Sequence, residues 1–217
     1  SAGKIDNELE KIFGDIPSGL IPLNGKPVIF RIIDKLIEEG FKKISITVGY
    51  KKEILEQIVK EQYKNQCYLE FISTDFKKPP GNSIKTAINY CNEEKLLIIL
   101  GDTLIENNLI DLVNKGKNFV ITSQEFSNIK NWCVVTKKEN KIDKIFDKED
   151  LVNNEKYHAL VGCYFINNQN LLKNVLSDFS DNEKLEISSI IEKIKGKEEF
   201  QLEFAKKWHD VGHLENY

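Results

Sequence analysis

Two aspartates stand where a carboxylate could bind a metal ion. Asp102 follows the apolar run "LLIIL" (96–100) and Gly101, and Asp210 lies in "WHDVGH" (208–213). In open α/β sheets, ligands bind beyond the carboxyl ends of the strands. Mg²⁺ is usually held there by one or two carboxylates together with phosphates. Asp102 is therefore a candidate magnesium ligand, and its alternative is a cap on the next helix or turn.

The segment around Asp210 also carries His209 and His213, a spacing that could ligate Zn²⁺ on a helix. However, Gly212 lies between them, the preceding residues alternate like a strand, and the HExxH pattern is absent. Three interpretations stay open: a zinc site, a loop in which Asp210 faces a site, and a structural turn. We favour the loop.

One further segment could bind a nucleotide. "PPGNSIKTAINY" (79–90) puts a Gly-Asn-Ser turn at a helix start, where free backbone N–H groups can hold an anion or a base edge. The alternative is a plain N-cap by Asn82 or Ser83. The glycine-containing stretch 1–27 lacks GxxxxGK[ST] and is therefore not a P-loop.

Hydrophobic periodicity predicts the elements that position these residues. A helix opens at Pro27 and stops at Gly40, a strand covers 44–48, and another helix contains Ile54 to Val59. These are followed by a strand at 67–73, a helix from just after Gly81, and a strand at 96–100 that is expected to be buried on both faces. The resulting β-α-β-α-β order is typical of a parallel sheet. The second half is richer in strands, and its expected elements are strands at 119–123, 132–137, 141–147, 157–166 and 200–205 and helices around 168–176 and 186–195.

The composition of the chain narrows the class of protein it can belong to. The chain has 217 residues, 41% hydrophobic and 30% charged, with a net charge of −3, so no basic field argues for a nucleic-acid partner. No apolar run approaches the roughly 20 residues of a membrane span. The four cysteines form no CxxC pair, which favours reduced thiols and a cytoplasmic location. Because the sequence contains no methionine, we expect a piece of a longer chain.

Taken in order, eight segments resemble the sugar-1-phosphate nucleotidyltransferases, also called sugar-nucleotide pyrophosphorylases. "SAG" (1–3) resembles the end of the family's AAG opening, and "WHDVGHLENY" resembles its W-x-D-x-G-[TH] element. Those between are "IPSGLIPLNGKPVI", "PPGNSIKTAI", "LLIILGDTLI", "VVTKKENKIDKIFDKED", "VGCYFI" and "EISSII".

The resemblance implies a three-layer α/β/α fold with a mostly parallel, mixed sheet, Rossmann-like and similar to the glycosyltransferase-A fold. Residues 1–217 would form one nucleotidyltransferase domain, with a first strand and a C-terminal continuation outside it. The implied reaction is Mg²⁺-dependent transfer of a nucleoside monophosphate from an NTP to a sugar 1-phosphate, or a similar small phosphate ester, with release of pyrophosphate. Segments such as "PSG" and "DVGH" resemble nucleotidyltransferase domains of capsule or surface-polysaccharide proteins.

The resemblance also assigns roles to residues. Asp102 and Asp210 would hold the metal ion and, with Lys4 and Lys26, form the catalytic set. The nucleotide would contact Ala2, Gly3, Pro80, Gly81, Asn82, Ser83 and Asp102. The acceptor would contact Asp147, Lys148, Gly162 and Glu186.

Two departures from the family stand at the phosphate-binding end. The G-x-G-x-R loop is replaced by "GKIDNELEKIFGD", in which Lys4 or Lys11 could substitute for the arginine, and Ser18 replaces the lysine of the P-K pair. The alternative function is therefore a nucleotide or sugar-nucleotide sensor without turnover. A histidine-based metal hydrolase ranks third. A homo-oligomer or a fused second domain fits either of the first two.

Overall fold

The computed structural model describes residues 3–124, 132–147, 156–180 and 183–212. Its centre is β10 (His158–Ile166), a strand with all nine residues buried. On β10, Val161, Cys163 and Phe165 face one apolar cluster. The residues that alternate with them, including Tyr164, face a second. A strand covered on both faces is the middle layer of three.

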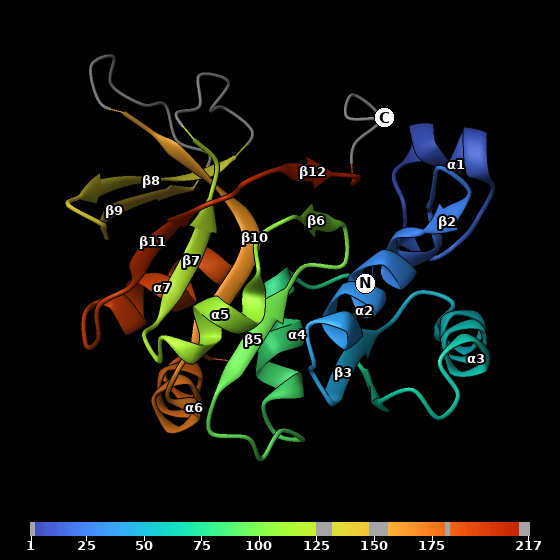
Figure 1. The fold of residues 1–217 in the computed structure, drawn as a ribbon, viewed down its shortest axis with the longest axis horizontal. Coiled ribbons are helices and arrows are strands. Elements are labelled where there is room, and N and C mark those ends of the chain that lie inside the picture. Colours follow the sequence, from blue (N-terminus) through green and yellow to red (C-terminus); the bar gives the residue numbers. More distant parts are fainter. Residues whose placement is uncertain (1–2, 125–131, 148–155, 181–182, 213–217) are drawn as a thin grey trace.

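Helices supply the outer layers (Figure 1). One cluster contains residues of α2 (Val28–Glu38), α3 (Lys52–Gln62) and α5 (Leu109–Asn114). The other contains residues of α6 (Gln169–Ser177) and α7 (Ile187–Lys195) and packs against α4 (Pro80–Ala87). The expected three-layer α/β/α arrangement is confirmed.

The six-stranded sheet has the order β5-β10-β7-β11-β9-β8, and β8 also pairs with β10. β11 lies parallel to β7, and the other pairs in this sheet are antiparallel. The remaining bounds are β5 (Leu96–Ile99), β7 (Phe119–Thr122), β8 (Cys133–Lys138), β9 (Lys141–Asp147) and β11 (Gln201–Phe204).

A separate parallel pair is formed by β3 (Lys43–Val48) and β4 (Tyr68–Ser73). The sheet is thus mixed, as expected, but among the described strands the parallel pairs are fewer than a mostly parallel sheet implies. One reason is the turn at Glu139 and Asn140, which makes β8 and β9 an antiparallel hairpin. The other is that β3 and β5 do not pair with each other in the described chain.

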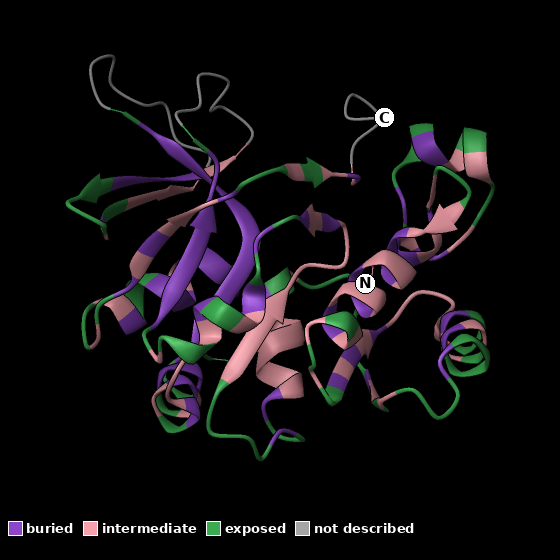
Figure 2. Ribbon diagram, in the orientation of Figure 1, coloured by how far each residue is buried: buried purple, intermediate pink, exposed green. Residues whose placement is uncertain are grey.

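A cleft of about 680 Å³ lies where that pairing would be, lined by residues of both β3 and β5. All four residues of β5 are consequently only half-buried, which corrects the expectation that this strand is buried on both faces. Figure 2 shows the contrast between β5 and the buried β7 and β10.

Several short elements were not expected from the sequence. The longest is α1 (Asn7–Phe13), where Asp6 caps the helix by accepting hydrogen bonds from two backbone N–H groups. Leu9 on α1 is buried against Ile5 and Ile21. The others are the 3₁₀ turn Ser18–Leu20, α5, and the short strands β1 (Pro22–Leu23), β2 (Lys26–Pro27), β6 (Thr103–Ile105) and β12 (Trp208–Asp210).

Candidate active site

β6 and β12 bring the two aspartates together. The strands pair antiparallel with Asp210 opposite Thr103, which directly follows Asp102. Just beyond this pair, the Val211 N–H donates to the Asp102 carbonyl oxygen at 3.0 Å. The strand register therefore fixes the backbones of two residues that are far apart in the sequence.

The surroundings of Gly212 show how close the two carboxylates lie. A Cβ atom built on Gly212 would lie 3.1 Å from Asp102 Oδ2 and 3.1 Å from Asp210 Oδ1. Two oxygens at that distance from one point are at most twice that distance apart. The Gly212 N–H also donates to Asp210 Oδ1 at 2.8 Å, which orients this carboxylate. Glycine at 212 thus leaves a small space bordered by both side chains.

Two carboxylates facing one space suit Mg²⁺, which takes hard oxygen ligands and completes its shell with phosphates and water. Within the described residues there is no group of three or more His, Cys, Asp or Glu side chains that could hold a metal ion. His209 is exposed on a strand, so the described part of "WHDVGH" does not form the helix that a zinc pair would need. His213 lies outside the described residues.

Most of the expected nucleotide-binding residues lie in the same cleft as Asp102 and Gly212. Gly3, Pro80 and Ser83 line it. Asn82 is a neighbour of these residues on α4, and its Oδ1 is buried with no hydrogen-bond partner among the described residues. Ala2 lies outside the described residues.

Gly81 has a packing role. A Cβ atom there would lie 2.3 Å from the carbonyl oxygen of Leu185, so only glycine lets α4 approach the segment before α7. The segment 79–90 does begin a helix, but α4 starts at Pro80, one residue before Gly81, with proline in its first turn.

The lysines expected to neutralise phosphate charge already have carboxylate partners. Lys4 lines the cleft, and its ammonium lies 2.9 Å from Glu10 Oε2 on α1. The hydrogen bond to Glu10 raises the pKa of Lys4. Lys26 is paired with Asp34 on α2 and is not among the cleft-lining residues. The structure thus places Lys4, but not Lys26, in the cleft that Asp102 lines.

A cation that sequence reasoning missed is Lys78, which lines the cleft together with Lys4 and Asp102. Its signal in the sequence is its position directly before "PPGNS". A basic residue just before the N-terminus of a helix adds positive charge where anions bind.

The expected acceptor-binding residues fall into two places. Gly162 has φ +84°, and a Cβ atom on it would lie 2.7 Å from Thr103 Oγ1, so this residue packs directly behind β6. Asp147 ends β9 and accepts a hydrogen bond from Ser188 Oγ at 2.6 Å. Glu186 is the N-cap residue of the helix that carries Ser188.

Asp147 and Glu186 therefore meet at the start of α7, while Lys148 lies outside the described residues. Sequence reasoning missed Ser188. Its signal is "EISS", where the family's E-[IL]-T-D element also has a hydroxyl two residues after the glutamate.

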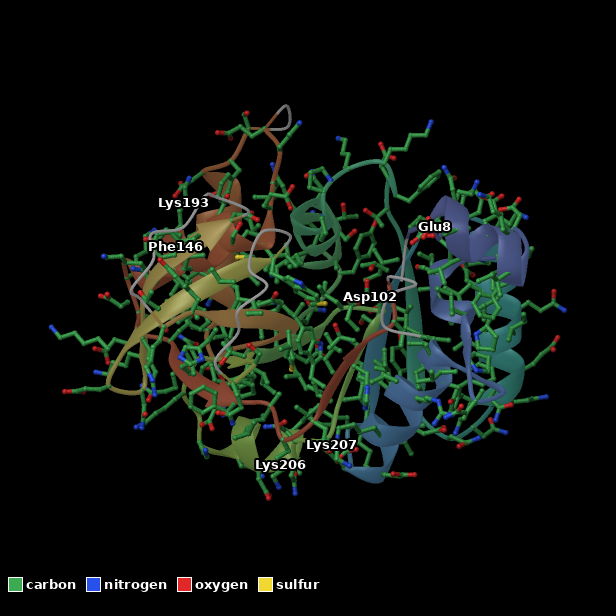
Figure 3. The ribbon with its side chains drawn as sticks, turned by 90° about the horizontal axis from the view of Figure 1, so that it is seen from above. Glu8, Asp102, Phe146, Lys193, Lys206 and Lys207 are labelled. Atoms are coloured by element: carbon green, nitrogen blue, oxygen red, sulfur yellow. The ribbon has the colours of Figure 1, made fainter. Side chains whose placement is uncertain are left out.

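Seen from above, Asp102 lies between two ends of the molecule (Figure 3). On one side is α1, marked by Glu8, and on the other is β9, marked by Phe146. Asp102, which lines the cleft, thus lies between α1 and β9, the strand that ends at Asp147.

Comparisons with known proteins find relatives of this chain in both sequence and fold. The chain is 27% identical over 219 residues to the bifunctional protein GlmU of Methanococcus maripaludis, covering 98% of this chain and 50% of that protein. It is 25% identical over 198 residues to the D-glycero-alpha-D-manno-heptose 1-phosphate guanylyltransferase of Campylobacter jejuni, covering 88% of this chain and 82% of that one. The chain therefore spans about half the length of the GlmU protein.

Among solved structures, a UDP-glucose pyrophosphorylase complexed with UDP-glucose superposes with a TM-score of 0.82 at 19% identity, covering 100% of this chain and 93% of that one. This likeness confirms the Rossmann-like nucleotidyltransferase fold. The family model described as "Nucleotidyl transferase" matches residues 14–217. The chain belongs to the nucleotidyl transferase family.

Proposed function

We propose that this chain transfers a nucleoside monophosphate from an NTP to a sugar 1-phosphate, or to a similar small phosphate ester, with release of pyrophosphate. The observation that carries the proposal is the convergence of Asp102 and Asp210 on Gly212. This point borders the cleft that Gly3, Pro80 and Ser83 line. Family membership supplies the reaction class.

The residues present can do this chemistry by positioning and charge neutralisation. Asp102 and Asp210 would hold Mg²⁺, which when bound neutralises charge on the nucleotide's phosphates. The acceptor's phosphate oxygen is already ionised at neutral pH, so no side chain has to act as general base. Asp147, fixed by Ser188, would accept a hydroxyl hydrogen bond from the acceptor.

The finer assignments belong to the same proposal. The role in surface-polysaccharide precursor synthesis rests on the resemblance of "PSG" and "DVGH" to such proteins. The cytoplasmic location rests on the four free cysteines. Of the helices in the described residues, none has the length and apolar character needed to cross a membrane. A homo-oligomer or a fused second domain stays part of the proposal.

The test is pyrophosphate release, screened with four NTPs against sugar 1-phosphates and phospho-alcohols in Mg²⁺. With the best pair, Asp102→Asn and Asp210→Asn should each lower the rate by roughly 10³-fold, as loss of one charge-stabilising group does in other enzymes. Asp111→Asn, an exposed carboxylate on α5, is the matched control and should leave the rate unchanged. Full activity in either site variant would refute the two-aspartate mechanism.

A second candidate function is nucleotide sensing without turnover. It is favoured by the pairing of Lys4 with Glu10 and of Lys26 with Asp34, which leaves both lysines already neutralised. Measurable NTP binding with no pyrophosphate release from any pair in the screen would support the sensor. Release with any pair would exclude it.

A further inference from the structure

Phe76 is an aromatic residue that stays partly open inside the cleft. It lines the cleft together with Gly3, Pro80 and Ser83, and it is 36% exposed. The described part of the chain exposes other large apolar side chains, but none of them lines the cleft: Ile12, Ile54, Tyr68 and Tyr90. Ligand clefts are lined by apolar and aromatic groups that the ligand covers. Phe76 is therefore a candidate ligand contact.

The strands place Phe76 at the ligand-binding edge of the sheet. β3 and β4 run parallel and end side by side, with Val48 opposite Ser73. Tyr50 follows the end of β3, and Phe76 follows the end of β4. Because ligands of open α/β sheets bind beyond the carboxyl ends of the strands, both rings lie on the side where a ligand is expected.

Tyr50 holds the ring of Phe76 in place without burying it. The two ring centroids are 5.3 Å apart, and the ring planes are inclined by 66°. Aromatic pairs favour such edge-to-face contacts. The Tyr50 hydroxyl in turn donates a hydrogen bond to Asp15, just after α1. A ring that is already fixed loses little conformational entropy when a ligand covers it.

Positive charges flank the two rings. The Lys4 ammonium lies 5.7 Å from the centre of the Tyr50 ring. Lys78 follows Phe76 by two residues, and it lines the cleft with Lys4. Lysines bind phosphate groups as point charges. A ligand that carries both phosphates and a flat apolar ring would therefore contact the lysines and Phe76 together.

A nucleotide is the substrate with this combination. Every nucleobase has an aromatic face that stacks on an aromatic side chain, whichever base it is. The acceptor has its candidate contacts elsewhere, because Asp147 and Ser188 lie at the end of β9 and the start of α7. Figure 3 places α1 and β9 on opposite sides of Asp102, and Tyr50 ties Phe76 to the α1 side.

We propose that the base of the bound NTP stacks on the ring of Phe76, so that this residue selects nucleotides over other polyphosphates. The inference rests on the proposed function, and it adds a contact that the resemblance does not assign. Stacking tolerates all bases. Phe76 therefore contributes affinity for a nucleotide and leaves the choice among bases to other groups.

The experiment separates the base from the phosphates. Isothermal titration calorimetry with Mg²⁺ measures the affinities of ATP, CTP, GTP, UTP and inorganic tripolyphosphate, which has the phosphates alone. The variants are Phe76→Leu, which keeps an apolar side chain without a ring, and Phe76→Tyr, which keeps the ring. Tyr68→Leu is the matched control, since Tyr68 is exposed but does not line the cleft. Melting temperatures test whether each variant is folded.

Phe76→Leu should weaken the best-binding NTP about tenfold or more, the usual size for loss of a stacked base, and should leave tripolyphosphate binding unchanged. Phe76→Tyr should bind this NTP within about twofold of the wild type, because its ring can still stack. Tyr68→Leu should change neither affinity. A second measurement needs no variant: in the wild-type complex, base protons should give nuclear Overhauser contacts to the Phe76 ring.

Three results would overturn the proposal: unchanged NTP affinity in Phe76→Leu, an equal loss for the NTP and tripolyphosphate, or no contact between the base and the ring. The test of turnover is separate. The expected binding pattern without pyrophosphate release would support the stacking and remove only the transferase function. Pyrophosphate release with unchanged NTP affinity in Phe76→Leu would remove only the stacking. Absence of NTP binding by the wild type would overturn both.

Discussion

The two halves of the candidate site are built in different ways. Asp102 and Asp210 are positioned by a strand ladder, and Gly212 keeps the space between them open. Lys4, which also lines the cleft, is held in an ion pair with Glu10 between partly exposed side chains. Strand pairing resists rearrangement, whereas partly exposed ion pairs contribute little and exchange partners readily.

The difference suggests separate roles for the carboxylate half and the lysine half of the site. The carboxylate half, formed by Asp102 and Asp210, is preorganised, which is what stabilisation of developing charge in a reaction requires. If Lys4 binds the nucleotide as proposed, the lysine half is adaptable, because a triphosphate would replace Glu10 as the partner of Lys4. The family's arginine would not need this exchange, so the departures in "GKIDNELEKIFGD" change how positive charge is supplied.

We expect the largest effect from a substitution that disturbs the packing behind β6, the strand that follows Asp102. Gly162→Ala adds a Cβ atom 2.7 Å from Thr103 Oγ1 at φ +84°. The strained conformation costs about 1–2 kcal/mol, and the overlap adds about 1–3 kcal/mol. We expect urea unfolding to show a loss of about 3 kcal/mol or more.

The control for this variant is Gly116→Ala, at φ +65° with no atom within 4 Å of the added Cβ. It should show the conformational cost alone, about 1–2 kcal/mol. Equal losses for Gly162→Ala and Gly116→Ala would mean that β10 does not support β6 in this way.

The next effect concerns the acceptor end. Ser188→Ala removes the hydrogen bond to Asp147 Oδ2, and a hydrogen bond to a charged group is worth about 1.5–3 kcal/mol. We expect the acceptor's KM to rise roughly tenfold while the KM for the NTP stays unchanged, because the loss is confined to the orientation of Asp147. Steady-state kinetics measure both values. Ser189→Ala, its neighbour on α7, is the control, and a rise in the KM for the NTP would contradict this role.

A smaller effect is expected from removing the ion pair of Lys4. Glu10→Gln releases Lys4 from its ion pair, so we expect the KM for the NTP to fall two- to fivefold, in keeping with the small strength of exposed pairs. Glu8→Gln, on the same helix α1, should change nothing. A higher KM in Glu10→Gln would show that Glu10 helps to position Lys4 for the nucleotide rather than competing for it.

The smallest effect is a pH dependence near the same end. Hydrogen bonds from Lys51 and Tyr50 lower the pKa of Asp15 below its ordinary value. A lowered carboxylate pKa stabilises the fold above the unfolded value, about 3.9, and this contribution disappears as the pH falls through the folded value. Melting temperatures of the wild type and Asp15→Asn should therefore differ slightly at pH 6 and converge as the pH falls through this lowered folded-state pKa. A difference that grows toward acid would contradict this.

The sequence predicted the elements whose pattern is set locally. Period-two alternation identified β3, and the residue pattern from Pro27 to Gly40 identified α2, because burial of one face leaves a signal in the sequence. α1 gave no such signal, since only Leu9 on it is buried and its start depends on the Asp6 cap.

Features that depend on packing between distant segments were not predictable. The half-exposed state of β5 follows from the cleft beside it, which no property of "LLIIL" reveals. The position after a strand predicted Asp102, the resemblance paired it with Asp210, and the register of β6 with β12 brings the two together. Their roles as metal ligands stay predictions, as do those of Lys4 and Lys26. The partners Glu10 and Asp34 of these two lysines come from helix faces that the sequence alone did not connect to them.

The most direct measurement is the affinity for Mn²⁺, as a stand-in for Mg²⁺, in the complex with the preferred NTP. It is measured by electron paramagnetic resonance for the wild type, Asp102→Asn, Asp210→Asn and the double variant. If both carboxylates hold one ion, each single change should weaken binding at least about tenfold, and the double variant should bind little worse than the weaker single one, since groups that act as a unit are not additive. Independent effects that multiply in the double variant, or unchanged affinity in either single one, would contradict a shared metal site at Gly212.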